Sequence, residues 1–215
     1  MPDDIYRVEE VMNAATNART GRIDKNVDPT PFERNLSQDQ RLLIIILGAM
    51  GRITNQNRIQ SIAYLLKTLM YFPFAYKFRL TDHPVSDSLA WDLFRLRSER
   101  ILGERLVQTR LLDSDSFTSL PRNAEYTLTP FAKILLANFV SKDHNCARLH
   151  SEAEVFSSKI WKNGYVKNIE RYASWTYICK DIRPREPKEV ISFYEKEHEF
   201  KHAECEKFLN AVVRP

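Results

Sequence analysis

The strongest catalytic spacing lies in residues 198–202, where His198, Glu199 and His202 spell HExxH. On a helix the two histidines share one face, as in zinc peptidases, and the glutamate activates the metal-bound water. That chemistry also needs a third metal ligand and a substrate cleft. Lysines and glutamates surround the spacing on both sides, which is typical of a solvated helix face. We therefore interpret it as a chance match and expect no metal.

Other catalytic signatures are missing from the sequence. It contains no G-x-S-x-G nucleophile elbow, and Gly48 and Gly51, two of only five glycines, form neither a P-loop nor a dinucleotide fingerprint. Both phosphate-binding motifs need several glycines, because backbone amides must approach the phosphate closely. We expect a protein that is not an enzyme, with no catalytic residues and no cofactor.

A group of arginines could bind DNA through its phosphates. The expected helix over residues 87–100 presents Ser88, Trp91 and Arg95, together with two carboxylates, Asp87 and Asp92, that oppose phosphate contact. Ordinary surface arginines are the alternative interpretation. The candidate DNA-binding residues are Arg95, Arg97, Arg100, Arg105, Arg110 and Arg122.

Aromatic residues in the C-terminal third could form a protein interface, since Trp, Tyr and Arg dominate binding hot spots. They alternate with lysines and arginines between residues 159 and 177, and packing within the chain or stacking on single-stranded bases are the alternatives. The candidate partner-interface residues are Phe32, Trp161, Tyr165, Trp175 and Phe193.

The elements that must position these residues begin after an arm and linker over residues 1–36. The arm has one short helical pattern around Ile5 and Val8, and its acidic residues outnumber its basic ones. We therefore expect it to dock on protein rather than to embrace DNA. Ser37 and Gln40 then form a capping box for a helix that ends near Gly48 or Gly51.

A second helix, capped by Thr54 or Asn55, continues until Pro73 stops it. Alternation of aromatic and polar residues over 74–80 predicts a strand, and Ser86 or Asp87 caps a third helix that Gly103 closes. Residues 104–112 and 125–129 are predicted as strands of a long hairpin, before Pro130 starts a helix through Val140.

Residues 141–215 are predicted to form a helical extension. Its first helix breaks at Gly164, a second break follows at Pro184 and Pro187, and a last helix covers about residues 188–213 with Phe193, Phe208 and Val212 near one stripe. The predicted fold is therefore mainly α with a small β hairpin: an arm over 1–36, a domain over 37–140 and an extension over 141–215.

The composition excludes several classes. The chain has 215 residues, a formal net charge of +4 and 43% hydrophobic residues. Its three cysteines include no CxxC pair, and this argues against a disulfide framework and a structural zinc site. No apolar run approaches the roughly 20 residues of a membrane-spanning helix. The first residues lack a secretory signal, so we expect a cytoplasmic protein with no membrane partner.

Helix, helix, strand, helix, hairpin and closing helix is the order of a winged-helix domain with an extra strand. Residues 58–78, 83–89 and 126–129 resemble a family of small bacterial and archaeal winged-helix proteins, over about residues 38–140. The sequence departs from that family at Asp82 and His83, where a Tyr-Gly-Pro turn is usual. These motifs determine shape, and they are more specific for fold than for function.

The resemblance implies an accessory subunit, similar to the winged-helix middle components that accompany SMC-like ABC ATPases or nucleases in anti-phage and anti-plasmid defence. In that role the chain bridges a larger protein partner and can touch DNA. The alternative function is a homodimeric DNA-binding transcriptional regulator or antitoxin, which would recognise paired half-sites.

Overall fold

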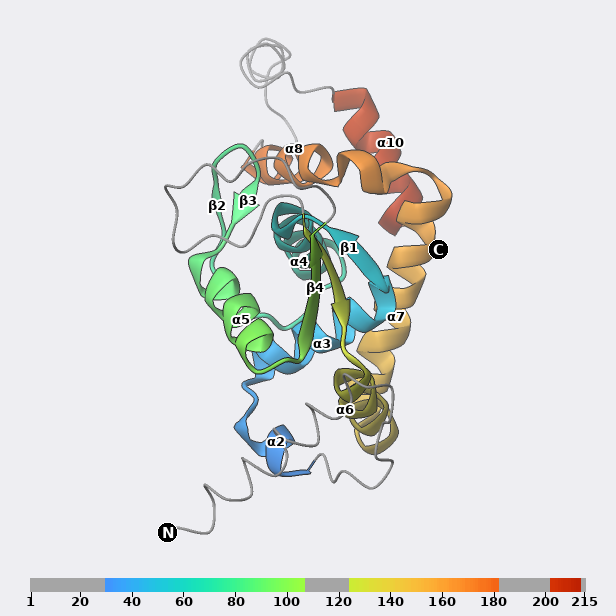
Figure 1. The fold of residues 1–215 in the computed structure, drawn as a ribbon. Helices are drawn as coiled ribbons and strands as arrows, with labels where there is room; N and C mark the ends of the chain where they lie inside the picture. Colours follow the sequence, from blue (N-terminus) through green and yellow to red (C-terminus); the bar gives the residue numbers. More distant parts are fainter. Residues whose placement is uncertain (1–29, 107–123, 182–201, 214–215) are drawn as a thin grey trace, which may run out of the picture.

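Helices dominate the structure, a computed structural model that describes residues 30–106, 124–181 and 202–213 (Figure 1). A three-stranded antiparallel sheet lies near its centre, and a separate two-stranded hairpin lies beside it. The expected class, mainly α with small antiparallel β elements, is confirmed. Residues 1–29, which include most of the predicted arm, lie outside the described residues.

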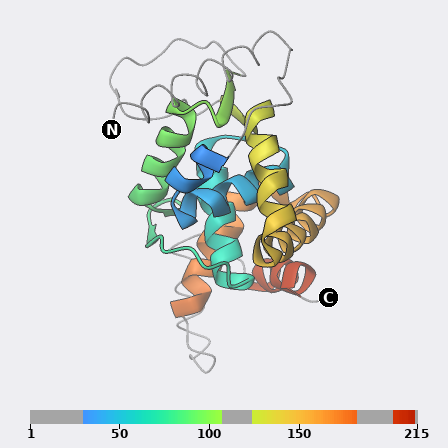
Figure 2. The same ribbon diagram turned by 90° about the horizontal axis from the view of Figure 1, so that it is seen from below.

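Helices α3 (Gln38–Met50) and α4 (Gln56–Leu69) form the middle of the molecule, with α5 (Asp87–Ser98) on one side and α6 (Pro130–Lys142) on the other (Figure 2). The predicted capping box is confirmed, because Ser37 Oγ accepts from the Gln40 amide at 3.1 Å and Gln40 Oε1 accepts from the Ser37 amide at 3.0 Å. Of the two predicted cap residues of α4, Thr54 and Asn55, it is Asn55 that caps the helix. Leu43 to Ile46 are fully buried, so α3 is the central helix of the core.

The two glycines near the end of α3 have different roles. Gly48 lies inside the helix, where a Cβ atom would collide with the side chain of Leu136 on α6, so it permits close packing of the two helices. Gly51 ends the helix with φ of 72° and ψ of −81°, a positive-φ conformation that glycine adopts more readily than residues with a Cβ atom.

The central sheet contains β1 (Arg52–Thr54), β4 (Leu102–Leu106) and β5 (Ala124–Leu128), in the order β1-β5-β4. Tyr126 of β5 pairs with Ile53 on one side and with Glu104 on the other. The hairpin of β4 and β5 was predicted, although residues 107–123 between them lie outside the described part of the chain. Strand β1 was not predicted, because three residues are too few to show an alternating pattern.

The predicted strand over residues 74–80 is wrong for most of its length. Only β2 (Arg79–Leu80) is a strand, and it pairs with β3 (Pro84–Val85). Residues 72–76 do alternate between buried aromatic and exposed side chains. Their backbone is bonded by side chains instead, with Asp39 Oδ1 accepting from the Ala75 amide at 3.0 Å and Lys67 Nζ donating to the Tyr76 carbonyl at 2.5 Å. An alternating sequence pattern indicates which side chains are buried, but it does not show that another strand is present to pair with the segment.

The predicted end of the third helix at Gly103 is also wrong. Helix α5 ends at Ser98, and Arg100 takes φ of 57° immediately after the cap. The Ile101 amide donates to the Leu96 carbonyl and the Arg100 amide to that of Arg97, which is a Schellman motif with arginine at the position usually held by glycine. Because Ile101 and Leu96 are both buried, their contact favours this ending, and Gly103 becomes part of β4.

The C-terminal helices belong to the same hydrophobic core. The structure continues with α7 (His144–Lys162), a 3-10 turn η2 (Tyr165–Asn168), α8 (Ile169–Asp181) and α10 (His202–Val213). Helix α7 packs on α3, and α8 packs on α4. The predicted break at Gly164 is confirmed by its φ of 70°. The predicted domain boundary at 140/141 lies close to the end of α6 at Lys142. Side chains from both sides of this boundary belong to one hydrophobic core.

Short helix α2 (Thr30–Asn35) attaches the end of the predicted arm to the core. Its Phe32 ring packs edge-on against Phe131 at 5.3 Å, and Arg41 Nη2 donates to the Glu33 carbonyl at 2.7 Å. Among the described helices, none combines the length and the hydropathy needed to span a membrane.

Two of the cysteines, Cys146 and Cys205, have side chains in the described regions, and neither forms a disulfide. Cys205 is buried, and partial burial with the neighbouring Asp143 carboxylate raises the pKa of the Cys146 thiol to about 11. A thiol with a raised pKa is a poor nucleophile at neutral pH, so Cys146 is not activated for nucleophilic chemistry.

Candidate interaction surface

Helix α5 carries the largest exposed aromatic pair of the described structure. Leu89, Leu93 and Leu96 are buried on its inner side, so the helical period places another set of residues outward. We call this outer side the α5 surface: Ser88, Trp91, Phe94, Arg95 and Ser98, all of which are exposed.

Trp91 and Phe94 form the apolar centre of the α5 surface. Trp91 is 69% exposed and Phe94 is 47% exposed, and their rings meet edge-to-face with centroids 5.9 Å apart. They lie three residues apart on one helix face, which brings side chains into contact. Aromatic residues that remain accessible in such a pair present a rigid apolar area of the kind found in binding hot spots.

A buried hydrogen-bond network fixes α5 against the core. Asp92 Oδ1 accepts from Gln40 Nε2 at 2.8 Å, and its Oδ2 accepts from the Tyr76 hydroxyl at 2.7 Å. Burial and the Asp92 carboxylate raise the pKa of Tyr76 far above its usual value, so its hydroxyl stays protonated and donates. Asp92 was expected to be a surface charge opposing DNA, but it is half-buried and bonds to α3 and to the segment between α4 and β2.

A side chain of α4 binds the backbone at the start of α5. Gln60 of α4 donates a hydrogen bond from Nε2 to the Ser86 carbonyl at 3.2 Å, and its Oε1 accepts one from the Ser86 amide at 2.9 Å. The Ser86 side chain makes no cap hydrogen bond, although serine is a favoured N-cap residue. Asp92 and Gln60 together fix the rotation of α5, and this rotation determines which residues face outward.

Carboxylates of the same chain neutralise several arginines around the α5 surface. Arg95 pairs with Glu99 at 2.8 Å, Arg97 with Glu104 at 2.6 Å, and Arg79 with Asp87 at 3.2 Å. The hydrogen bond to Glu99 raises the pKa of Arg95, which keeps the guanidinium charged. Such pairing reduces the local positive potential that would attract phosphate.

The other predicted DNA-binding residues lie in different regions. Arg100 and Arg105 are exposed near the end of α5 and on β4, whereas Arg110 and Arg122 lie outside the described residues. Arg97 also has a structural role, because the side chain of its partner Glu104 is only 11% exposed.

The predicted partner-interface residues do not form one surface. Trp175 is 2% exposed, and burial against Tyr172 and Cys205 removes it from the surface. This corrects its predicted role: the alternative of packing within the chain holds. Tyr165 is half-buried in the same aromatic region, with its ring 5.2 Å from Phe208. Trp161 is half-exposed at the end of α7, Phe32 packs on Phe131, and Phe193 lies outside the described residues.

Sequence reasoning missed Phe94, although its spacing of three from Trp91, away from the leucine stripe, was a usable signal. The contacts of Gln40 with Asp92 and of Gln60 with Ser86 carried no such signal, since the partners are distant in sequence. His198 and Glu199 of the HExxH spacing lie outside the described residues. Within the described ranges, no group of three or more His, Cys, Asp or Glu residues could hold a metal ion.

The fold and the site define this molecule as a mainly helical protein with an aromatic surface on one helix. Comparison of the chain with protein-family models, with curated proteins and with solved structures finds no match.

Proposed function

We propose that this chain is a non-enzymatic, cytoplasmic winged-helix subunit that binds a larger protein partner through the α5 surface. The single observation that carries this proposal is the exposed pair Trp91 and Phe94 on a helix held firmly by Asp92. A large exposed apolar side chain costs solubility, and contiguous exposed apolar groups mark interaction sites.

The order of elements supports the winged-helix assignment. Helices α3, α4 and α5 are followed by the hairpin of β4 and β5, and β1 lies between the first two helices and completes the sheet. In this arrangement α5 takes the place of the recognition helix of a helix-turn-helix protein. An aromatic pair at that place favours protein contact over the reading of base edges.

The kind of partner follows from the sequence resemblance. It points to an SMC-like ABC ATPase or a nuclease in a DNA-associated complex that acts in anti-phage or anti-plasmid defence. The chain would bridge such partners and would not itself perform chemistry. This part of the proposal rests on family-level analogy.

The test is to replace both aromatic residues of the α5 surface, Trp91→Ser with Phe94→Ser, and to purify the tagged chain from its native operon context. We expect the stoichiometric partner to be lost, because hot-spot side chains each contribute about 2 kcal/mol or more to binding. Light scattering after size exclusion measures the mass of the complex, and mass spectrometry identifies the partner.

The matched control is Val155→Ser, which removes a 49% exposed apolar side chain from α7. It should leave the complex intact, since α7 lies across the molecule from α5 (Figure 1). Thermal melting of both variants should match the parent. A double variant that keeps its partner at full stoichiometry would contradict the proposal.

A homodimeric DNA-binding regulator is the second candidate function, and the exposed arginines Arg100 and Arg105 favour it. Arg95→Ala and Arg105→Ala should then each weaken binding to the protein's own upstream DNA and lower the salt slope by about one unit. Fluorescence anisotropy at several salt concentrations measures both effects. Arg97 is unsuitable for this test, because its loss leaves the largely buried Glu104 carboxylate without its ion pair.

For the regulator, Arg95→Lys and Arg105→Lys are the controls, since each keeps the charge that phosphate contact needs. A parent protein that shows no salt-dependent DNA binding would exclude this second function.

A further inference from the structure

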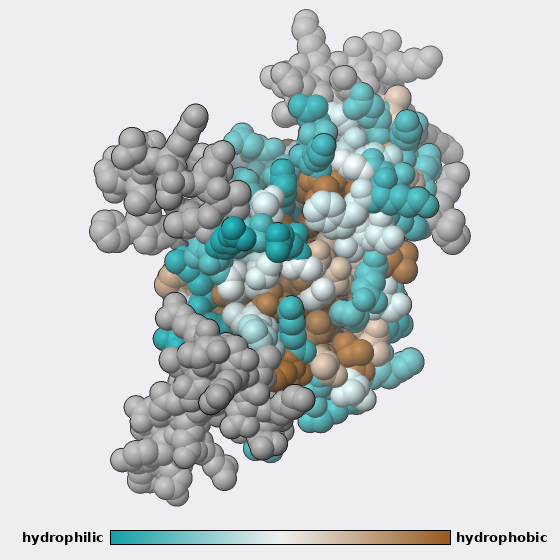
Figure 3. Space-filling view, turned by 45° about the vertical axis from the view of Figure 1, so that its right-hand side comes forward, coloured by the Kyte–Doolittle hydropathy of each residue, from teal (hydrophilic) through white to brown (hydrophobic). Residues whose placement is uncertain are grey.

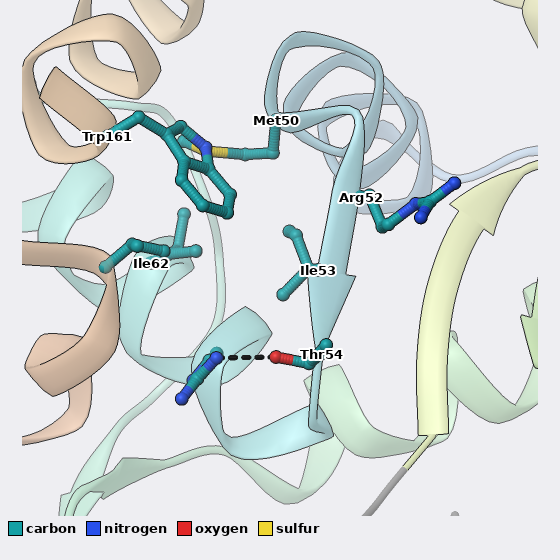
Figure 4. A pocket seen from close by; sticks show the side chains of 8 residues that line it. Met50, Arg52, Ile53, Thr54, Ile62 and Trp161 are labelled. Carbon is teal, nitrogen blue, oxygen red and sulfur yellow. Dashed lines mark hydrogen bonds between the residues drawn. The ribbon is translucent and has the colours of Figure 1, made fainter. Parts of the chain in front are cut away.

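A pocket of about 170 Å³ lies between the end of α3, β1, the start of α4 and the end of α7. Met50, Ile53, Ile62, Val166 and Trp161 supply most of its lining, and the indole of Trp161 reaches over it from α7 on the side of Met50 (Figure 4). Figure 3, in which the α7 side of the molecule comes forward, shows hydrophobic residues along the centre of this face with hydrophilic residues around them. The pocket is thus largely apolar.

One end of the pocket is polar. Arg58 Nη1 donates to Thr54 Oγ1 at 2.5 Å, and Arg58 Nε donates to Glu170 at 3.3 Å. These two bonds fix the guanidinium beside Thr54, which lies at the end of the pocket away from Trp161 (Figure 4). The contact with Glu170 is an ion pair, which offsets part of the charge of Arg58. A guanidinium has five N–H donors, so the two bonds still leave donor capacity for a further acceptor. Arg52, the other arginine of the lining, points away from the pocket and pairs with Glu125 at 3.0 Å.

The volume of the pocket limits what can enter it. An engineered apolar cavity of about 150 Å³ in another protein binds benzene. A pocket of 170 Å³ therefore fits one six-membered ring with a short substituent. Ligand sites commonly combine an apolar lining with a few polar groups that orient the ligand, and Arg58 with Thr54 supplies such groups here.

We propose that this pocket binds a small aromatic carboxylate, with its ring between Trp161, Ile53 and Ile62 and its carboxylate at Arg58. Burial of the ring supplies the apolar contribution to binding. The carboxylate accepts charge-assisted hydrogen bonds from the guanidinium, and these are stronger than bonds between neutral groups. The site is separate from the α5 surface, so its test is independent of the proposed function.

The experiment uses the full chain and phenylacetate as the probe, with binding followed by NMR at the Trp161 indole N–H and the methyl groups of Ile53 and Ile62. We expect saturable shifts at these groups with millimolar phenylacetate. The neutral isostere phenylacetamide should bind about tenfold more weakly, since it lacks the charge that strengthens the bonds to Arg58. The absence of saturable shifts at these groups, or equal affinity for the two compounds, would overturn the proposal.

Two variants and a control locate the site. Arg58→Gln should weaken phenylacetate binding about tenfold, whereas Arg148→Gln, which alters an exposed arginine of α7 outside the pocket lining, should leave it unchanged. Trp161→Ala should also weaken phenylacetate binding. Because the Trp161 indole is half-exposed, this variant should stay folded, and it tests the proposal even if Arg58→Gln unfolds.

Discussion

Replacement of Phe156 with alanine is expected to lower the free energy of unfolding by about 3–5 kcal/mol, the range for loss of a buried aromatic side chain. Phe156 is fully buried on α7, and α7 packs on α3, the central helix of the core. The cavity left by the ring cannot close easily, since α3 is itself surrounded by other elements. Urea denaturation measures the loss as a lower midpoint at an unchanged slope.

The control for Phe156 is its neighbour Val155, which is 49% exposed on the same helix. Val155→Ala should change stability by no more than about 0.5 kcal/mol, as is usual for surface substitutions. Fluorescence from the exposed Trp91 and the buried Trp175 should report one common transition, because both belong to elements that share the core. Two separate transitions, or a Phe156→Ala variant as stable as the parent, would show that residues 141–215 fold apart from the rest.

Replacement of Asp92 with alanine is the second large effect, with an expected loss of about 2–4 kcal/mol. The variant leaves the Gln40 amide and the Tyr76 hydroxyl without their acceptor, and both residues are almost fully buried. A buried donor without a partner bears its full desolvation penalty. Chemical denaturation measures the effect, and partner binding should weaken with it, because Asp92 fixes the rotation of the α5 surface.

Asp87→Ala is the matched control on the same helix. Asp87 pairs with Arg79 at 3.2 Å, and both side chains are mostly exposed. Surface ion pairs of this kind contribute about 1 kcal/mol or less, so the loss should be small. If Asp87→Ala and Asp92→Ala lost equal stability, the network would not hold α5 as argued above.

The site was only partly predictable from the sequence. Periodicity placed Trp91 and Arg95 on the outer side of α5, because the leucines at 89, 93 and 96 mark the buried side. The same periodicity could not show that Asp92 is half-buried, since its partners come from residues 40 and 76. Ion pairs such as Arg97 with Glu104 likewise depend on how β4 returns along α5.

The sequence by itself determined the local elements: the capping box at Ser37, a cap of α4 at Thr54 or Asn55, the start of α6 at Pro130 and the break at Gly164. Each depends on residues within one or two turns, so propensity and capping chemistry are sufficient. Only the tertiary structure decided that residues 74–78 stay unpaired, that β1 completes the sheet and that Trp175 is buried. These outcomes depend on side chains distant in sequence, whose positions no local pattern encodes.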